Sequence, residues 1–556
     1  MERALLPSGA TMHLVTPFLP LWLAEAAARY VRGAALRHVW LTRLRVRRLL
    51  AMWGRQSTWR RFDPFPYSPS SAFNRGDPLS EQRLKDILSI LRNRWLLDDE
   101  LTHACRERAL GSNPPSGTEL QQMFLAGLIE RRAAVGMGSF GRLECRRCGG
   151  QTSVVVVECA VCGGECPECR ECLSWGVARG CSALLSATSV EPVCRQRSGL
   201  RPVSYHLPFA LSSAQATAAT EIQEAIDQGK RRVLVWAACG AGKTEVVYEP
   251  MAQTLRRGGR VLIMTPRRDV TADLCERLKS VFSSESIAGL YGGAPQKYPE
   301  AEVFVATTHQ AVRLGGQFDL VVFDECDAFP YTDSPVLQRA VARLADLAGC
   351  FVQMTATPTK PQLQRAQQAD SRLVYIPARH HGHPLPVPVV HVDSSLTKES
   401  LHRIPRALRE ALVQTMDEGA QLLIFVPRRA LVEPVVAALR REGYRRVMGV
   451  YSGSQERDAV REALRTGAVE VVVSTTVFER GLTFPMVNVA VLFADAERVF
   501  DAAALIQMAG RVGRTPQRPT GRVWFICSRP GRQIREACAA IETLNRMAKE
   551  RGLLKA

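Results

Sequence analysis

Short apolar runs separated by longer amphipathic stretches recur over the second half of the chain. From residue 231 onward the runs are rich in Val, Leu, Ile and Phe, and the stretches between them carry apolar residues at helical spacing. The runs cover residues 231–238, 260–266, 302–308, 318–325 and 350–358, then 421–427, 447–453, 470–476, 487–495 and 521–528. Continuous apolar runs of this length are typical of strands buried in a parallel sheet with crossover helices.

The segment "RHHGHPLPVPVV" interrupts this alternation, and its prolines are typical of a linker. The same alternation resumes after it. The pattern therefore predicts an α/β fold with two tandem parallel-sheet lobes, over residues 205–383 and 384–556.

The pattern before residue 205 is different. Residues 77–110 and 118–135 predict helices, with Ser80 as a candidate N-cap and "GSNPPSG" as the break between them. An Arg- and Trp-rich segment before residue 75 predicts a basic amphipathic helix that contacts a membrane surface or nucleic acid, and a poorly ordered start is the alternative. We expect a basic, mainly helical region over 1–140, a cysteine-rich module over 141–185 and a loop-like stretch to about 205.

Composition narrows the class of protein. A chain of 556 residues is too long for one core and predicts two to four domains. The formal net charge of +19 favours an anionic partner such as nucleic acid, with an Arg-rich solvated surface as the alternative. The apolar segment "MHLVTPFLPLWLA" is too short for a membrane span and lacks the features of a secretory signal. We expect a cytoplasmic chain with reduced thiols, in which clustered cysteines indicate metal before disulfide.

The segment "AACGAGKT" follows an apolar run and precedes a helical one, which is the context of a phosphate-binding P-loop. Its glycines allow the backbone N–H groups to approach phosphates, Lys243 reaches the β- and γ-phosphates, and Thr244 binds Mg²⁺. The first position is Ala237, where the strict pattern has Gly. The predicted ATP-binding loop consists of Ala237, Ala238, Cys239, Gly240, Ala241, Gly242, Lys243 and Thr244.

The run "LVVFDECD" ends in Asp324 and Glu325, about 80 residues after the P-loop. A carboxylate at the end of a strand binds Mg²⁺ directly or through water, and its neighbour orients and deprotonates the attacking water. An acidic loop after a strand is the alternative interpretation. The upstream P-loop favours a catalytic pair.

These motifs and their order resemble those of superfamily 2 helicases and translocases. The further segments that match are "LSSAQ", "TPRRDV", "TTHQ", "TATP", "LLIFVPRRA", "STTVFERGLTF" and "QMAGRVGR". The resemblance implies two RecA-like lobes with ATP between them. It also implies that Gln215 recognises adenine, that Gln507 contacts phosphate or water, and that Arg511 and Arg514 are arginine fingers.

A motor that moves along nucleic acid needs contacts to the backbone that ignore sequence, for which Thr, Arg and Lys are suited. An ordinary surface role is the alternative for each candidate. The candidates for nucleic-acid binding are Arg267, Arg268, Thr308, Arg428 and Thr475.

Seven cysteines lie between residues 145 and 172, in CxxC spacings that suit tetrahedral Zn²⁺. One ion needs four thiolates, and Cys181 would complete eight, which is enough for two ions. An iron–sulfur cluster and a redox CxxC are the alternatives. The cysteines of the segment are Cys145, Cys148, Cys159, Cys162, Cys166, Cys169 and Cys172.

The paired segments "CRRCG" and "ECRECLSWG" resemble the four-cysteine element of the late-competence ComFA family. Three further segments, "DECDAFPY", "RHHGHPLPVP" and "PRRDV", are similar to that family as well. The resemblance implies Cys145, Cys148, Cys169 and Cys172 as the primary zinc ligands. It leaves Cys159, Cys162 and Cys166 as a second or alternative set.

The replication-restart helicase PriA is the nearest alternative family, because it shares the "GKTE" loop and carries zinc cysteines. Its zinc insert lies within the second lobe, whereas the cysteines of this chain precede the P-loop. A zinc-dependent DNA-binding scaffold with a decayed motor is the alternative that is not an enzyme.

The ComFA resemblance implies an ATP-dependent translocase on single-stranded DNA that acts in uptake of transforming DNA, with ATP, Mg²⁺ and Zn²⁺ as cofactors. It implies a cytoplasmic protein with peripheral association at the inner face of the membrane. The implied partners are single-stranded DNA, the competence DNA-channel protein, the phosphoribosyltransferase-like competence protein ComFC and a DNA-processing recombinase loader.

Overall fold

The computed structural model describes residues 80–555, apart from 109–113, 139–140, 189–200, 317, 395, 397–402, 480–483 and 517. The amphipathic helix predicted before residue 75 therefore lies outside the described residues. The chain forms two compact units. The first unit contains the residues up to Val203 with Thr254–Val321 and Phe329–Gly349, and the second contains Ser204–Gln253, Val322–Ala328 and Cys350–Ala556.

A seven-stranded sheet has the order β10-β11-β9-β12-β13-β8-β14. Strand β8 pairs in parallel with β13 and β14, and β11 pairs in parallel with β9 and β10. Every residue of β9, β11 and β12 is buried, which explains their continuous apolar runs. The strands are β8 (Arg232–Ala237), β9 (Val261–Thr265), β10 (Ile287–Leu290), β11 (Val303–Thr307), β12 (Leu320–Asp324), β13 (Cys350–Thr355) and β14 (Ser371–Ile376).

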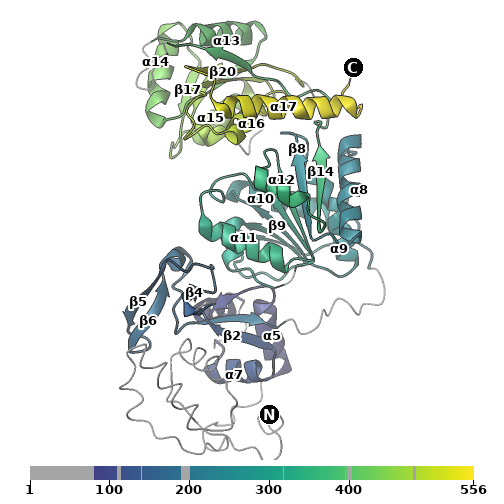
Figure 1. Ribbon diagram of the computed structural model, residues 1–556, viewed down its shortest axis with the longest axis vertical. Helices are drawn as coiled ribbons and strands as arrows, with labels where there is room; N and C mark the ends of the chain where they lie inside the picture. The colour runs from purple at the N-terminus through teal and green to yellow at the C-terminus, as the bar shows by residue number, and fades with distance from the viewer. Residues whose placement is uncertain are drawn as a thin grey trace, which may run out of the picture. The chain divides into compact units, whose positions relative to one another are not determined.

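Helices or 3-10 turns separate these strands along the chain except between β10 and β11 (Figure 1). They are α8 (Ser213–Asp227), α9 (Tyr248–Arg256), α10 (Arg268–Val281), α11 (Pro335–Leu347) and α12 (Lys360–Ala366). Short 3-10 turns η3 (Glu245–Val247) and η4 (Thr308–Val312) follow the P-loop and β11.

The second sheet lies wholly in the second unit and has the order β15-β20-β19-β16-β18-β17, with parallel pairs throughout. Its strands are β15 (Val389–Val392), β16 (Gln421–Phe425), β17 (Val447–Val450), β18 (Val471–Ser474), β19 (Val487–Leu492) and β20 (Val523–Cys527). Its helices are α13 (Arg406–Asp417), α14 (Val432–Arg441), α15 (Arg457–Thr466), α16 (Ala502–Ala509) and α17 (Arg532–Glu550). The prediction of two parallel-sheet lobes is confirmed.

The part of the first unit on either side of the cysteine segment combines helices with a small antiparallel sheet. Its elements are α5 (Glu81–Leu91), β1 (Leu96–Leu97), α6 (Asp98–Glu107), α7 (Gly117–Leu125), β2 (Ile129–Ala133) and β7 (Ala183–Ala187). Ser80 caps α5 by accepting a hydrogen bond from the Arg83 N–H at 3.2 Å, as expected.

The predicted helix over 118–135 is wrong at its C-terminal end. Helix α7 stops at Leu125, Gly127 adopts a left-handed φ of 70°, and the following residues form β2. Strand β7 pairs with both β1 and β2, and it runs across the predicted boundary at residue 185 between the cysteine-rich module and the loop-like stretch. Pairing with a partner some 55 residues later overrides the local helical spacing.

The cysteine segment folds into two hairpins and a 3-10 turn. The hairpins are β3 (Val135–Met137) with β4 (Leu143–Cys145) and β5 (Val154–Cys159) with β6 (Gly164–Cys169), and the turn is η2 (Glu171–Trp175). Within the part of the chain that the structure describes, none of the helices combines the length and apolar character that crossing a bilayer requires.

Candidate ATP and metal sites

The P-loop leaves β8 at Ala237 and turns sharply before η3. Gly240 and Gly242 have φ values of 80° and 66°, a left-handed conformation that favours glycine. A Cβ atom on Gly242 would also lie 2.3 Å from the Gln215 side-chain nitrogen. Ala237, at the first position of the motif, is buried as the last residue of β8. The substitution of Ala for Gly therefore falls on a strand residue and not in the turn.

Lys243 and Thr244 both contact Asp324, the last residue of β12. The Lys243 Nζ lies 3.4 Å from one carboxylate oxygen of Asp324, and the Thr244 hydroxyl donates to the other at 3.0 Å. Burial lowers the pKa of Lys243, but the carboxylates of Asp324, Glu325 and Asp327 outweigh it, so the pKa lies above its usual value. The hydroxyl and the carboxylate are hard oxygen donors of the kind that Mg²⁺ takes, so these residues fit that ion.

Glu325 follows Asp324 in a left-handed conformation, with φ of 53°. Such a conformation is uncommon outside glycine and is often found at functional sites. Its Oε2 is buried and has no hydrogen-bond partner among the described residues. A buried carboxylate oxygen without a donor can accept a proton from water, which is the chemistry predicted for this residue.

The second lobe approaches the P-loop through Gln507 on α16. The Cys239 thiol lies 3.5 Å from the Gln507 Oε1, and Gln507 Nε2 lies 3.5 Å from a carboxylate oxygen of Asp327. The same Asp327 oxygen accepts a hydrogen bond from Thr357 of the "TATP" segment at 2.6 Å. Asp327 therefore connects the acidic motif with the "TATP" segment and with Gln507. No role for Asp327 followed from the sequence, in which it appeared only within the segment "DECDAFPY".

After the end of α16, Arg511 is buried and Arg514 is half-buried. Arg511 Nε donates to the Glu479 carbonyl and Arg514 Nε to the Gly510 carbonyl, both at 2.9 Å. Burial lowers the pKa of both guanidinium groups. A Cβ atom on Gly240 would lie 3.8 Å from Arg514, so this side chain is next to the P-loop.

Arg379, in the histidine- and proline-rich linker, was not predicted as a site residue. Its Nε donates to the Cys239 carbonyl of the P-loop at 2.9 Å, and its Nη1 donates at 2.6 Å to the carbonyls of Val512 and Gly513. Burial lowers its pKa to about 10. The sequence feature that could have indicated Arg379 is its position as a basic residue at the start of the segment between the lobes.

Gln215 lies in the first turn of α8 and is buried. Its Oε1 accepts from the Ser212 N–H at 2.9 Å in a capping box, and its Nε2 donates to the Gly242 carbonyl at 3.0 Å. In this structure Gln215 therefore supports the P-loop, and its predicted adenine contact remains a prediction.

The five candidates for nucleic-acid binding differ in exposure. Arg268 and Arg428 are exposed, and Arg267 and Thr475 are half-buried. Thr308 is fully buried, and its hydroxyl is without a hydrogen-bond partner in the described residues. The two exposed arginines are therefore the most accessible of the five.

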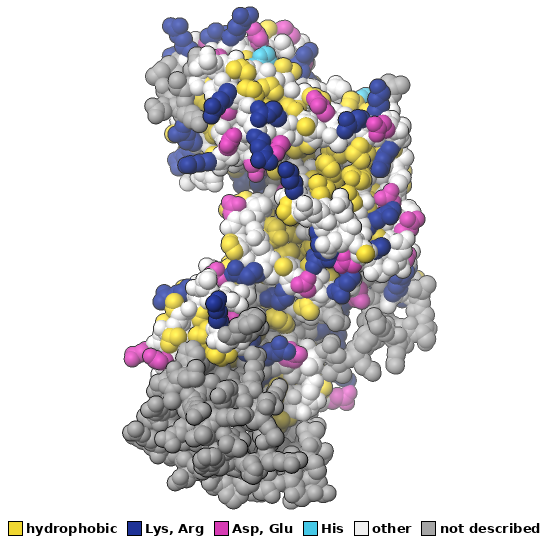
Figure 2. All heavy atoms as spheres, in the orientation of Figure 1, with side chains coloured by type: hydrophobic (Ala, Val, Ile, Leu, Met, Phe, Trp, Pro, Cys, Tyr) yellow, Lys and Arg dark blue, Asp and Glu magenta, His cyan; other side chains and the backbone are white. Residues whose placement is uncertain are grey.

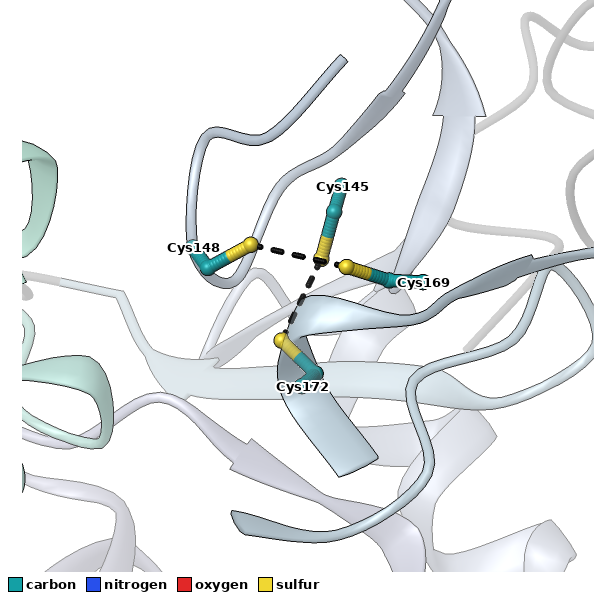
Figure 3. A group of neighbouring side chains, drawn as sticks. All are labelled: Cys145, Cys148, Cys169 and Cys172. Atoms are coloured by element: carbon teal, nitrogen blue, oxygen red, sulfur yellow. Dashed lines mark hydrogen bonds between the residues drawn. The ribbon is translucent and has the colours of Figure 1, made fainter. Parts of the chain in front are cut away.

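The sulfurs of four buried cysteines lie close together where the turn after β4, the end of β6 and η2 come together, as Figure 3 shows. The Cys145 and Cys172 sulfurs are 3.7 Å apart, and those of Cys148 and Cys169 are 3.6 Å apart. A tetrahedral Zn²⁺ with bonds of about 2.3 Å places its sulfurs about 3.8 Å from one another. The geometry fits a single zinc ion, and these are the four residues predicted as the primary set.

A second group of sulfurs consists of Cys159, Cys162, Cys166 and Cys181. The sequence predicted the first three as a second or alternative set and Cys181 as the residue that would complete eight thiolates, and the structure brings all four sulfurs together. The remaining described cysteines lie apart from both groups. Cys105, Cys239, Cys275, Cys326, Cys350 and Cys527 are buried, and Cys538 is half-buried.

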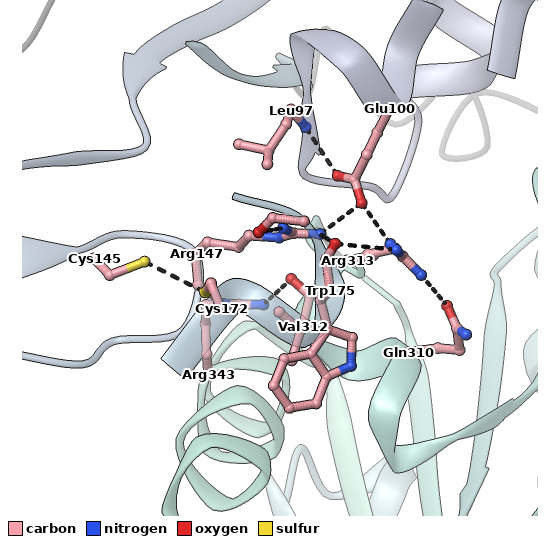
Figure 4. Close-up of polar contacts among 11 residues, drawn as sticks. Leu97, Glu100, Cys145, Arg147, Cys172, Trp175, Gln310, Val312, Arg313 and Arg343 are labelled. Carbon is pink, nitrogen blue, oxygen red and sulfur yellow. Dashed lines mark hydrogen bonds and ion pairs between the residues drawn. The ribbon is translucent and has the colours of Figure 1, made fainter. Parts of the chain in front are cut away.

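The first cysteine group is held on the first lobe by partly buried ion pairs within the first unit (Figure 4). One Glu100 oxygen accepts from Arg147 Nη2 and from Arg313 Nε, each at 2.6 Å. The two arginines also donate to the Trp175 carbonyl, at 3.0 and 3.2 Å. Arg147 belongs to the "CRRCG" turn and Arg313 follows η4, so Glu100 of α6 joins three parts of the chain. Sequence reasoning missed this cluster, because nothing local marks Glu100.

Comparison with known families covers most of the chain. The family "Competence protein ComFA N-terminal domain" matches residues 81–186. The families "Type III restriction enzyme, res subunit" and "Helicase conserved C-terminal domain" match residues 208–360 and 402–516. The first match covers the N-terminal helices and both cysteine groups, and the other two cover most of each lobe.

Individual relatives agree with these matches. The chain is 30% identical to competence protein ComFA of Bacillus subtilis over 465 residues, which is 84% of this chain and 96% of the relative. It is 34% identical to ComFA of Streptococcus pneumoniae over 59% of this chain and 78% of the relative. Replication restart protein PriA of Bacillus subtilis is 23% identical over 40% of this chain and 30% of the relative.

Among solved structures, RecG bound to a three-way DNA junction is similar with a TM-score of 0.43 and 20% identity, over 64% of this chain and 50% of that chain. The family assignment depends on the sequence relatives and on the N-terminal match. These confirm the resemblance that the motifs predicted. The chain belongs to the ComFA family of competence proteins and carries the paired helicase domains of that family.

Proposed function

We propose that this chain is an ATP-driven translocase that moves along single-stranded DNA during uptake of transforming DNA. Membership of the ComFA family and the paired helicase domains support a competence-associated motor. The observation that carries the proposal is a pair of contacts made by the P-loop. Lys243 of the P-loop pairs with Asp324 of the first lobe, and Cys239 of the P-loop contacts Gln507 of the second lobe. A DNA-binding scaffold that no longer hydrolyses ATP would not require these contacts around the P-loop.

The residues of the ATP site divide the work of hydrolysis. Mg²⁺ would neutralise charge on the transferred phosphoryl group, and Thr244 and Asp324 would hold it. Lys243 would exchange its ion pair with Asp324 for the β- and γ-phosphates. Glu325 would take the proton of the attacking water at its free Oε2, and Gln507 would orient that water.

Arg511 and Arg514 would stabilise the charge that develops on the phosphoryl oxygens. The cross-lobe contact depends on that charge, so it weakens after hydrolysis and the cleft opens. If each lobe holds the DNA backbone in turn, repeated closure and opening moves the strand. We propose Arg267, Arg268, Thr308, Arg428 and Thr475 as the residues that contact it.

We propose Zn²⁺ at Cys145, Cys148, Cys169 and Cys172, where it would stabilise the module that Glu100 anchors to the first lobe. The partners implied by the family are the DNA-channel protein, the phosphoribosyltransferase-like competence protein and the recombinase loader. We propose that the chain acts at the cytoplasmic face of the membrane, where incoming DNA arrives.

The full-length protein should be tested for ATP turnover with single-stranded DNA, duplex, forked DNA and RNA, with zinc measured on the same sample. We expect single-stranded DNA to stimulate turnover most, without separation of the fork. Strand separation on the fork would favour a PriA-like restart helicase instead. DNA binding without any ATP turnover would favour the scaffold, and turnover indifferent to DNA would overturn the translocase.

A further inference from the structure

The turn after β5 repeats the geometry of the first zinc turn. The segment Cys159–Gly163 has the pattern CxxCG, as does Cys145–Gly149. Gly163 and Gly149 have left-handed φ values of 66° and 73°. In each turn the glycine N–H donates to the carbonyl of the first cysteine, at 2.9 and 2.7 Å. The chain thus builds the same cysteine turn twice.

Two further sulfurs are brought to the second turn by strand β6 and the segment that runs beside it. The Gly180 N–H donates to the Pro167 carbonyl at 2.8 Å, and the Cys169 N–H donates to the Ala178 carbonyl at 3.0 Å. An ion pair of 2.8 Å between Glu168 and Arg179 ties the same two segments together. This pairing carries Cys181 to Cys166.

The sulfur positions suit a metal ion and not a disulfide. The sulfurs of Cys159 and Cys181 are 3.8 Å apart, and all four of the group lie within 4.8 Å of one another. A disulfide requires about 2.05 Å between sulfurs, whereas the sulfurs around one tetrahedral Zn²⁺ are about 3.8 Å apart. Four thiolates in tetrahedral arrangement favour zinc among divalent ions.

The two cysteine groups are separate because β6 directs its two cysteines to opposite faces. Cys166 and Cys169 are three residues apart on this strand, and residues an odd number apart point to opposite faces. Cys169 therefore joins the first group, and Cys166 joins the second. The seven clustered cysteines cannot form one shared site.

We propose that Cys159, Cys162, Cys166 and Cys181 bind a second zinc ion, held at the same time as the first. The second ion would be the more accessible of the two. All four cysteines of the first group are buried, whereas Cys162 and Cys181 are half-buried and Val161 in the turn is 76% exposed. A chelator should remove the second ion first.

Metal content of the full-length protein tests this proposal directly. We expect two equivalents of zinc in the wild type, one in Cys181→Ser and in Cys162→Ser, and two in Cys538→Ser, a half-buried thiol outside both groups. One equivalent in the wild type, two in Cys181→Ser, or iron in place of zinc would overturn the proposal.

Two further measurements use the wild-type protein, so their results do not depend on whether a variant folds. Titration of metal-free protein with Co²⁺ should saturate the thiolate–cobalt absorption at two equivalents, and saturation at one would contradict a second site. Alkylation during chelation should label Cys159, Cys162, Cys166 and Cys181 before the first group. Labelling of the second group at full zinc occupancy would show that no ion protects it.

Discussion

At the scale of single residues, Lys243 is the side chain whose loss should be most specific. Lys243→Ala removes the proposed contact to phosphate and the ion pair with Asp324. We expect ATP turnover with single-stranded DNA to fall by at least about a hundredfold, as for the loss of a group that stabilises transition-state charge. The measurement is steady-state turnover, with a thermal unfolding curve to show that the variant is folded.

Lys279→Ala is the matched control, because Lys279 lies on the surface of α10 in an ion pair with Glu276. It should leave turnover unchanged. A folded Lys243→Ala protein that keeps full activity would remove the P-loop assignment.

His381 should give the protein a stability that depends on pH. Its side chain is buried with Nε2 2.9 Å from the Gly513 carbonyl, and burial lowers its pKa to about 4. The unfolded chain protonates it near 6.5. Between pH 6.5 and 4 the unfolded state therefore binds more protons than the folded state. The contribution of His381 to the free energy of unfolding is complete above pH 6.5 and falls by up to about 3 kcal/mol as the pH drops to 4.

The comparison of His381→Gln with wild type isolates this effect, because other groups act in the opposite direction. Burial raises the pKa of Asp98 to about 6, so the folded state favours the neutral carboxyl group. The contribution of Asp98 to the free energy of unfolding is therefore lost as the pH rises. Urea unfolding at pH 5 and pH 7 should show a smaller difference in the variant than in the wild type. His391→Gln, on the edge strand β15, should behave as wild type, and an equal pH dependence in all three proteins would contradict the prediction.

At the scale of secondary-structure elements, Glu100 connects α6 with the cysteine module and the first lobe. Its carboxylate is the shared partner of Arg147, which is fully buried, and of Arg313. Removing one partner from a buried ion pair is strongly destabilising, because the remaining charge stays buried. We expect Glu100→Gln to lower the free energy of unfolding of this region by about 3 kcal/mol.

Limited proteolysis and thermal unfolding measure this change. Glu130→Gln is the control, because its ion pair with Arg132 is exposed and should contribute less than about 1 kcal/mol. Equal stability of the two variants would mean that the Glu100 cluster does not hold the module in place.

At the scale of the whole molecule, charge should govern the binding of DNA. The net charge is +19, and on the face shown in Figure 2 the Lys and Arg side chains are spread among acidic and apolar ones. Contacts to phosphates release counterions, so affinity falls steeply with salt. A protein with six to ten such contacts loses about 10³-fold or more in affinity between 50 and 200 mM salt.

We expect single-stranded DNA of different base composition to bind alike and to show the same salt dependence. Fluorescence anisotropy of labelled strands measures both properties. Affinity that depends on base composition and not on salt would contradict binding through the phosphate backbone.

The sequence by itself determined the features that are encoded by neighbouring residues. The P-loop is eight consecutive residues, the buried strands are continuous apolar runs, and each of the two cysteine turns is a CxxCG segment. Each of these carries its structural requirement locally: glycine for a left-handed turn, or apolar side chains for a strand covered on both faces. The two lobes, the glycine turn of the P-loop segment and the grouping of the primary cysteine set could therefore be predicted.

Only the tertiary structure decided which distant residues meet. Strand β2 replaced the end of a predicted helix because β7 was available to pair with it. Arg379 binds carbonyls 133 and 140 residues away, and Glu100 binds an arginine 213 residues away. Cys181 reaches the second cysteine group because its segment runs beside β6. These contacts depend on chain topology, and a single sequence carries no local pattern that marks them.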